Sequence, residues 1–395
     1  MSSELPNPQV TAVVLTYNEE KRLGACLRAL SADVDEVLLI DSGSTDGTLA
    51  IAASQPLPVR VVHAPWRSDF AHQRNLAFSH IHRGWILMVD ADEVLAPTSG
   101  TTTVRQVLAQ LDHRQSHPDL VGCPEIQDVH DRAGHSTDLP RILRAQTTLR
   151  YRGRIHERPY DAAGNQPATV ALPIRLTHYG YLPEVIAEQS KEERHTSLLR
   201  LCRVEEPDNP KWVFYQVRAE LAALSDSTQA QELFSCLATA MAHCPDDAPD
   251  YLTERVEDSW SLMCELALHF GGAEQIASYS ARLEDTGRHA EAVYYRTVVA
   301  MSATLTRLSH LTEQVLGPLA RGTRGTARDI GRLHELQGLL ALACGRTDMV
   351  PRALEQAVAH GAGSVLISEL ARLQKLLSAT PSDHQTVHHS QEKSS

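Results

Sequence analysis

The chain has 395 residues, of which 42% are hydrophobic and 22% are charged, and its formal net charge is −12 at pH 7. A chain longer than about 250–300 residues usually divides into more than one domain, so we expect two. Proteins that bind nucleic acid need a basic stripe to neutralise phosphate. The acidic balance and the lack of such a stripe therefore argue against a nucleic-acid partner.

The sequence contains no recognisable membrane or export signal. The N-terminal stretch MSSELPNPQV lacks a basic segment followed by an apolar one, so we expect no secretory signal. No run of about 18 apolar residues is present, which excludes a transmembrane helix. The seven cysteines are widely spaced and form no CxxC pair, and we interpret them as reduced thiols of a cytoplasmic protein.

Strand-like and helix-like patterns alternate in the first half of the chain. We predict strands over residues 10–16, 36–41, 59–63 and 85–89, and helices over 19–31, 45–54 and 69–81. Thr45 or Asp46 is expected to cap the second helix. This alternation predicts parallel βαβ units, in which ligands bind beyond the carboxyl ends of the strands.

From about residue 187 to residue 377, helical spacing dominates, with short breaks that contain glycine or proline. The helix, glycine turn, helix layout resembles degenerate tetratricopeptide repeats, although no period of 34 residues is clean. The last residues are polar and contain proline and serine, which predicts disorder. We therefore expect a flexible N-terminus (1–9), an α/β domain (10–184), a helical repeat-like domain (185–377) and a disordered tail (378–395).

The stretch WILMVDADEVLAP ends a buried, apolar strand with acidic residues. In an extended chain, Asp90 and Asp92 would point to the same side with carboxylates roughly 6.5 Å apart. At an effective dielectric constant near 20, their repulsion is on the order of 2 to 3 kcal/mol. A positive charge is therefore expected beside them.

Polar residues also follow the first two predicted strands. The first is followed by LTYNEEKRL, which has no glycine-rich phosphate loop, so Tyr17 is free to lie against a nucleobase. Glu19 can instead cap the next helix or stabilise its first turn. The second strand ends in LLIDSGSTDGT, where Asp41 can bind a uracil or a ribose, although Asp-Ser-Gly is also ordinary turn chemistry.

The segments VVLTYNEEKRL, VLLIDSGSTDGT, FAHQRNLAF and WILMVDADEVL occur in this order along the chain. Together they resemble the nucleotide-sugar domain of family 2 glycosyltransferases, which have the GT-A fold. The resemblance is strong over residues 8–100 and extends weakly to 182. It also includes the peptide glycosyltransferases of ribosomal-peptide biosynthesis and the lipopolysaccharide-core glucosyltransferases.

This resemblance implies a nucleotide site, with a UDP-sugar as the expected donor. Thr16, Tyr17 and Glu19 would border the nucleotide. Asp41 would bind the uridine, and Arg74 would approach the base or the phosphates.

The resemblance also implies a metal site, because the sequence DAD matches the family's DxD motif. Asp92 would be the direct ligand, and Asp90 would bind the ribose or reach the metal through water. His178 resembles a histidine that completes the metal shell in some of these enzymes. The expected cofactor is Mn²⁺ or Mg²⁺, which would offset the charge of the departing diphosphate.

Family 2 enzymes generally invert the anomeric centre, which requires one general base near the acceptor. By resemblance to a G-x-[IV]-H-E segment, Glu157 is the first candidate and Asp138 the second. His156 is a further candidate, but a hydrogen-bonded core histidine is an equal alternative for it and for His178. Arg141 and Arg144 could face phosphate or be solvated.

Several alternatives remain open from the sequence. A sugar-nucleotide pyrophosphorylase is disfavoured by the missing glycine-rich loop, and a non-catalytic helical-repeat scaffold has no need for all three aspartates. The favoured acceptor is a Cys, Ser or Thr side chain of a peptide, held by the helical domain, and the alternative is a glycan or lipid-linked saccharide. The helical domain could also form a homo-oligomer.

Overall fold

The computed structural model describes residues 8–96, 103–114, 117–129, 135–180, 191–320 and 325–362. Most of the predicted flexible N-terminus, the whole predicted tail and the predicted boundary at 184/185 lie outside these residues. The chain divides into two compact units, Met1–Gln275 and Ile276–Ser395. The helices between residues 191 and 275 therefore belong to the same unit as the sheet.

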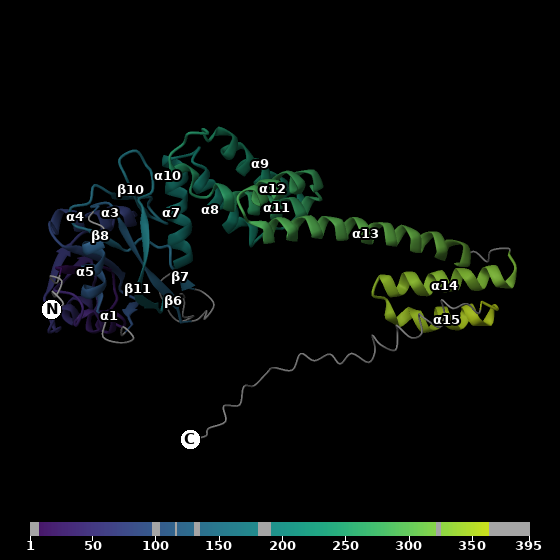
Figure 1. Cartoon of the computed structure of the whole chain (residues 1–395), viewed down its shortest axis with the longest axis horizontal. Helices are drawn as coiled ribbons and strands as arrows, with labels where there is room; N and C mark the ends of the chain where they lie inside the picture. The colour runs from purple at the N-terminus through teal and green to yellow at the C-terminus, as the bar shows by residue number, and fades with distance from the viewer. Residues whose placement is uncertain are drawn as a thin grey trace, which may run out of the picture. The chain divides into compact units, whose positions relative to one another are not determined.

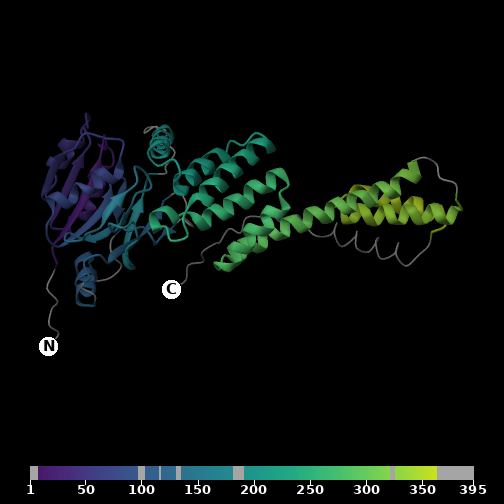
Figure 2. The same cartoon turned by 90° about the horizontal axis from the view of Figure 1, so that it is seen from above.

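The first unit is built on one large mixed sheet (Figure 2). Its strand order is β3-β2-β1-β4-β8-β6-β11-β5, and β7 pairs with β6. Strands β1, β2, β3 and β4 are mutually parallel, as the sequence predicted. Strand β8 runs antiparallel to β4, and β5 runs antiparallel to β11. A separate ribbon consists of β9 and β10. The strands are β1 (Val10–Thr16), β2 (Glu36–Asp41), β3 (Val59–His63), β4 (Trp85–Asp90), β5 (Glu93–Leu95), β6 (Val121–Asp128), β7 (His135–Ser136), β8 (Ile142–Arg144), β9 (Arg150–Arg152), β10 (Arg158–Tyr160) and β11 (Thr169–His178).

Helices cover both faces of the sheet, which explains why its central strands are apolar throughout. On β1, Ala12 and Val14 join a core formed with α1 and α5, whereas Val13 joins a second core formed with α3 and α4 (Figure 1). The helices of this layer are α1 (Leu23–Leu30), α2 (Thr48–Ala53), α3 (Phe70–Asn75), α4 (Ala77–His80) and α5 (Val104–Arg114).

The rest of the described chain is helical, and the predicted fold class, an α/β sheet domain followed by helices, is confirmed. Side-chain caps begin several helices: Asn209 accepts from the Lys211 amide at the start of α8, and Asp226 accepts from the Gln229 amide at the start of α9. The first unit contains α7 (Lys191–Glu205), α8 (Pro210–Leu221), α9 (Ser227–His243), α10 (Asp250–Thr253) and α11 (Val256–Phe270), and α12 (Ala273–Asp285) follows.

The second unit contains one long helix, α13 (His289–Ala320), and a helical hairpin. The hairpin joins α14 (Ala327–Ala343) to α15 (Val350–Ala359) through a short 3-10 turn, Thr347–Met349, around a small core (Figure 1). The 32-residue α13 is much longer than a helix of a tetratricopeptide repeat, so this part departs from a regular array. Among the described helices, none is long and apolar enough to cross a bilayer.

Three predicted elements differ in extent from the observed ones. The first helix begins only at Leu23, because residues 19–22 form a turn. The second begins at Thr48, although Asp46 still accepts the Thr48 amide at 3.0 Å. The helix predicted over 69–81 is interrupted at Leu76, next to the point where the Asn75 side chain pairs with the backbone of Tyr151.

One glycine fixes how β4 enters the sheet. Gly84 has a φ of +78°, and a Cβ there would collide with the carbonyl oxygen of Gln9. The same close approach lets the Trp85 amide donate to Gln9 at 2.8 Å, which sets β4 beside β1. Glycine is required here both for the backbone angle and for the space.

Candidate active site

The carboxyl ends of three adjacent parallel strands carry the first group of predicted site residues. The register pairs Thr16 of β1 with Asp41 of β2, and Leu15 of β1 with Asp90 of β4. Tyr17 follows β1 directly and is 54% exposed. Because parallel strands end at one edge, the structure brings Thr16, Tyr17, Asp41 and Asp90 to the same side of the sheet.

Asp41 is almost fully buried and is held by the tight turn that follows it. Its carboxylate accepts hydrogen bonds from the amides of Gly43 and Ser44 at 3.1 and 3.2 Å. Gly43 has a φ of +106°, which glycine adopts without strain. Beside this turn, the hydroxyl of Thr16 is buried and has no hydrogen-bond partner, which is an unusual state for a buried polar atom.

The loop after β1 is fastened to the loop after β2. The amide of Asn18 donates to Ser44 Oγ at 2.9 Å, and the amide of Glu19 donates to Thr48 Oγ1 at 2.7 Å. The Glu19 carboxylate accepts a hydrogen bond from Arg22 Nε at 2.7 Å. The two loops are thus held together by hydrogen bonds at the edge of the sheet beside Asp41.

Two arginines provide the positive charge expected beside Asp90. Its Oδ1 accepts from Arg74 Nη2 at 3.0 Å, and its Oδ2 accepts from Arg141 Nη2 at 2.9 Å. Burial alone would raise the pKa of Asp90, but Arg141 and Arg74 hold it well below its usual range. The carboxylate is therefore ionised and its charge is balanced within the protein.

Two further acids complete this charge cluster. Glu157 Oε1 accepts from Arg74 Nε at 2.7 Å, so Arg74 bridges Glu157 and Asp90. Glu93 accepts from the Asp90 amide at 2.8 Å and from Arg141 at 3.2 Å. Burial raises the pKa of Glu93 to about 7 although Arg141 acts in the opposite direction. Arg141 was one of two arginines expected to face phosphate or solvent, and it instead lies buried against these acids.

Asp92 does not continue the strand. The chain turns after Asp90, so the expectation that both aspartates lie on one side of an extended strand is wrong. Asp92 Oδ2 lies 3.6 Å from His178 Nε2, at the end of β11. The Tyr179 amide donates to the Asp92 carbonyl at 3.0 Å, which fastens the turn to β11.

His178 is oriented by a second carboxylate that the sequence reading did not single out. Its Nδ1 lies 2.6 Å from Asp128 Oδ1, at the end of β6. Burial disfavours a charged imidazole, but Asp92 and Asp128 together raise the pKa of His178 to about 9. A carboxylate on Nδ1 directs Nε2 toward Asp92, which is the arrangement common at metal-binding histidines.

Gly180 packs directly against this pair. A Cβ at Gly180 would collide with both Asp92 Oδ2 and His178 Nε2. Carboxylate and imidazole are both ordinary metal ligands, so the chemistry of the Asp92–His178 pair fits a small cation. Among the described residues, no group of three or more His, Cys, Asp or Glu side chains is arranged to hold a metal ion.

The remaining candidates are separated by the structure. Asp138 has a side chain that is 72% exposed, and it accepts from Ser136 Oγ at 2.7 Å and Arg158 Nη2 at 3.1 Å. Arg144 contacts Asp112 and lies over the Trp85 ring at 4.3 Å. Neither is joined to Asp90 by a described contact.

His156 is a packed histidine with a neighbour that the sequence did not predict. Its Nε2 lies 3.1 Å from Nε2 of His195, on α7. Burial, together with His195, lowers the pKa of His156 to about 3, so its imidazole is neutral near pH 7. Three residues of the site were not assigned a role from the sequence: Glu93, Asp128 and His195. Glu93 directly follows the DAD motif, and Asp128 ends a strand-like run, so both could have been found by position, whereas His195 has no motif around it.

Comparison with known proteins identifies the sheet domain. Residues 11–118 match the family model described as glycosyl transferase family 2. These residues therefore form a segment that is similar to family 2 glycosyltransferases. They contain β1, β2 and β4 and thus the strand ends that carry Asp41, Asp90 and Asp92. The predicted family and enzyme class are confirmed.

Three relatives show how far the similarity extends. The SPbeta prophage-derived glycosyltransferase SunS of Bacillus subtilis is 26% identical over 327 residues, which is 82% of this chain and 74% of that protein. A TPR repeat-containing protein of Synechococcus elongatus is 28% identical over 210 residues, covering 51% of this chain and 49% of that one. The lipopolysaccharide core biosynthesis glycosyltransferase LpsC of Rhizobium meliloti is 36% identical over 94 residues, covering 23% and 34%.

The charge cluster predicts that replacing Asp90 and replacing Asp138 change the free energy of unfolding by different amounts. Asp90→Asn should lower the free energy of unfolding by about 2–3 kcal/mol, because it leaves two buried guanidinium groups short of a partner. The matched change Asp138→Asn removes an exposed ion pair and should cost less than about 1 kcal/mol. Urea denaturation followed by circular dichroism measures both. Equal costs would show that Asp90 does not stabilise the cluster.

Proposed function

We propose that the enzyme transfers a sugar from a nucleoside-diphosphate sugar, in the first instance a UDP-sugar, to a peptide side chain with inversion of configuration. The proposal is carried by one observation. Asp41 ends β2, and Asp92 follows the end of β4 and lies against His178, so the acid proposed to bind the nucleoside and the pair proposed to hold a cation flank β1 at one edge of the sheet. A nucleoside diphosphate has a base and a ribose at one end, which suit Asp41, and a diphosphate at the other end, which suits a cation held by Asp92 and His178.

The nucleoside end of the donor would occupy the loops after β1 and β2. The Asp41 carboxylate is an acceptor for a uracil N–H or a ribose hydroxyl, and Thr16 Oγ1 is a buried hydroxyl with an unused hydrogen-bonding capacity. The exposed ring of Tyr17 offers a face for the base. Glu19 contacts Arg22 and Thr48 and so holds the loop after β1 in place, and its proposed role is to shape the site.

The diphosphate end would lie with a divalent cation beside Asp92 and His178. Two ligand atoms bound to one ion at about 2.0–2.2 Å can be up to about 4.4 Å apart, and the observed 3.6 Å satisfies this limit. Two protein ligands suffice, because Mg²⁺ is commonly held by one or two carboxylates together with substrate phosphates. A bound Mn²⁺ or Mg²⁺ would offset the negative charge that develops on the leaving diphosphate. Binding at Nε2 displaces a proton, so cation affinity should rise with pH toward about 9.

Arg74 and Asp90 are proposed to orient the donor indirectly. Arg74 already pairs with Asp90 and Glu157, so it links the end of β4 to Glu157, the proposed general base. Asp90 has a side chain that is 33% exposed, which leaves part of the carboxylate open toward a ribose hydroxyl. Its charge is neutralised by arginines, and this favours a hydrogen-bonding role over direct metal binding.

Glu157 is the proposed general base. Its ion pair with Arg74 keeps the carboxylate fixed near Asp90, where the anomeric carbon of a bound donor would lie. An acceptor group that attacks from this side loses its proton to Glu157 as the bond to the diphosphate breaks. Asp138 remains the second candidate, although Arg158 and Ser136 hold its exposed carboxylate.

The helical part of the chain favours a peptide acceptor. The resemblance to peptide glycosyltransferases includes a helical C-terminal region, and the match to SunS covers 82% of the chain. Such coverage must extend well into the helices, since the first 190 residues are less than half of the chain. The match to LpsC, which supports the glycan or lipid-linked alternative, covers only 23%.

The donor prediction can be tested by thermal shift. UDP-, GDP- and dTDP-sugars are added to the full chain with Mn²⁺ or Mg²⁺, and again with EDTA. A ligand at 100 times its dissociation constant should stabilise the protein by about 2.7 kcal/mol, and EDTA should remove most of this gain. The proposal fails if no nucleotide sugar raises the melting temperature in the presence of either metal.

The proposed roles of two acids predict different defects. Asp92→Asn should weaken metal-dependent UDP binding and turnover together, because it removes a ligand charge. Glu157→Gln should bind UDP nearly as well as the wild type but turn over about 10²-fold or more slowly, because only proton removal is lost. Calorimetric UDP titrations and UDP-release rates measure these effects, with Asp138→Asn as the control. Wild-type turnover by Glu157→Gln would transfer the base role to Asp138.

The acceptor prediction requires a direct comparison. The full chain is incubated with the donor that gives the largest thermal shift and, separately, with peptides containing one Cys, Ser or Thr and with a lipid-linked saccharide. Mass spectrometry should detect one added sugar on a peptide. Transfer to the saccharide but to no peptide would favour the glycan alternative.

A further inference from the structure

The residue before the proposed base has an unusual backbone. His156 has a φ of +53°, in the left-handed region that only a few per cent of residues other than glycine adopt, histidine more often than most. Such strain costs on the order of 1–3 kcal/mol and persists only where the surroundings determine the conformation. Glu157 follows directly, so the direction of its side chain depends on this residue.

Packing from the helical part of the first unit holds His156 in place. Its ring stacks on Tyr215 of α8 with centroids 3.8 Å apart and planes 6° from parallel. Its Nε2 meets His195 of α7. The same loop packs on α8 at Gly153, where a Cβ would lie 3.0 Å from the Trp212 ring.

Lys211, in the first turn of α8, reaches the backbone of the strained residue. It is fully buried, and its Nζ donates to the His156 carbonyl at 3.1 Å and to Glu254 at 2.6 Å. A buried lysine is rare unless it is paired, and here the surrounding rings of Trp212 and Tyr251 lie 4.9 and 5.3 Å from Nζ. The charged donor makes the bond to the carbonyl stronger than one between neutral groups.

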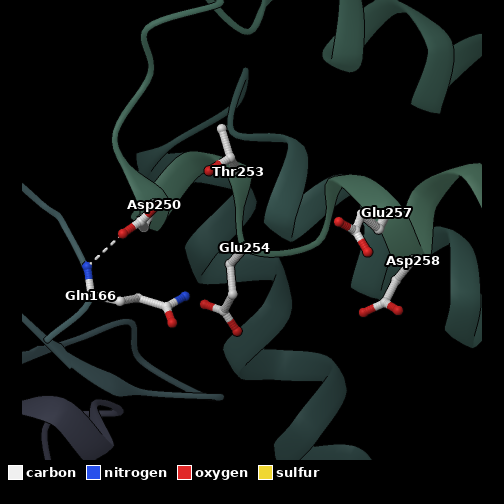
Figure 3. Close-up of a pocket in the computed structure, with 6 residues that line it drawn as sticks. All are labelled: Gln166, Asp250, Thr253, Glu254, Glu257 and Asp258. Carbon is white, nitrogen blue, oxygen red and sulfur yellow. Dashed lines mark hydrogen bonds between the residues drawn. The ribbon is translucent and has the colours of Figure 1, made fainter. Parts of the chain in front are cut away.

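Glu254 supplies the charge that keeps this lysine in place. Its Oε2 also accepts from Tyr160 Oη at 2.5 Å, and its Oε1 lies 3.2 Å from Arg255. Glu254 lies on the wall of a cavity of about 260 Å³, where its carboxylate points toward Gln166 (Figure 3). The other acids that line the cavity include Asp250, which accepts a hydrogen bond from the backbone amide of Gln166 at 2.8 Å. Because Arg255 and Lys211 already neutralise Glu254, its evident task is to hold Lys211.

We propose that Lys211 is a positioning residue for Glu157. By fixing the carbonyl of His156, it maintains the left-handed backbone that directs Glu157 to Arg74 and thus toward Asp90. A helix that follows the sheet in the same compact unit therefore helps to position the proposed catalytic carboxylate. This inference rests on the assignment of Glu157 as the base.

The experiment is a double-mutant cycle in the full chain. Lys211→Met alone would remove one charged partner of the buried Glu254 carboxylate, so the main variant is Lys211→Met/Glu254→Gln, which removes both charges at nearly constant size. Single-turnover UDP release is measured with UDP-glucose and Mn²⁺, or with the UDP-sugar that gives the largest thermal shift, and with water as the acceptor. We expect a loss of about 10- to 100-fold, with the dissociation constant for UDP within about twofold of the wild type.

The second arm repeats the change in the Glu157→Gln background. If Lys211 acts through Glu157, the further loss should shrink to less than about twofold. The same loss in both backgrounds, or no loss in the first, overturns the inference. The proposed function fails separately if Glu157→Gln alone retains wild-type turnover.

Two further variants control for folding. Asp226→Ala removes the cap of α9 and should destabilise the same helices by about 1 kcal/mol without changing turnover. If the main variant does not fold, Lys211→Met alone replaces it, since Glu254 then keeps Arg255 as a partner. Its loss of turnover must also disappear in the Glu157→Gln background, and a loss that persists there counts against the inference.

Discussion

The geometry of the site depends on the need to balance one carboxylate, that of Asp90, at the end of a buried strand. Arg74 and Arg141 meet it from α3 and from the segment before β8. These arginines in turn need acids, which Glu157 and Glu93 provide. Since an unpaired buried charge is costly, this chain of ion pairs fixes four distant segments relative to one another.

The same balance separates the tasks of the two aspartates in the DAD motif. Asp90 is neutralised internally, whereas Asp92 shares a histidine with Asp128. Two carboxylates and one imidazole carry a net negative charge even when the imidazole is protonated. Asp92 thus lies beside a carboxylate and an imidazole, which are groups that can bind a cation, whereas Asp90 lies between two guanidinium groups.

The helices that follow the sheet do more than cover it. Lys211 and Tyr215 of α8, and His195 of α7, all contact the single residue that precedes Glu157. In the first compact unit, the sheet and the helices up to Gln275 therefore share one cluster of interactions. Replacing these helices would therefore also disturb the segment that carries Glu157.

The sequence by itself determined the order of strands and helices up to β4, the α/β class and the strand-end acids Asp41, Asp90 and Asp92. These features are local, because apolar runs and the residues that end them follow from the periodicity of the backbone. It did not show that α7 and α8 approach Glu157, that arginines neutralise Asp90, or that Asp128 orients His178. His156 is 39 residues from His195 and 55 from Lys211 along the chain, and His178 is 50 residues from Asp128. Contacts between such distant residues are set by the packing of the sheet and helices, which only the tertiary structure decides.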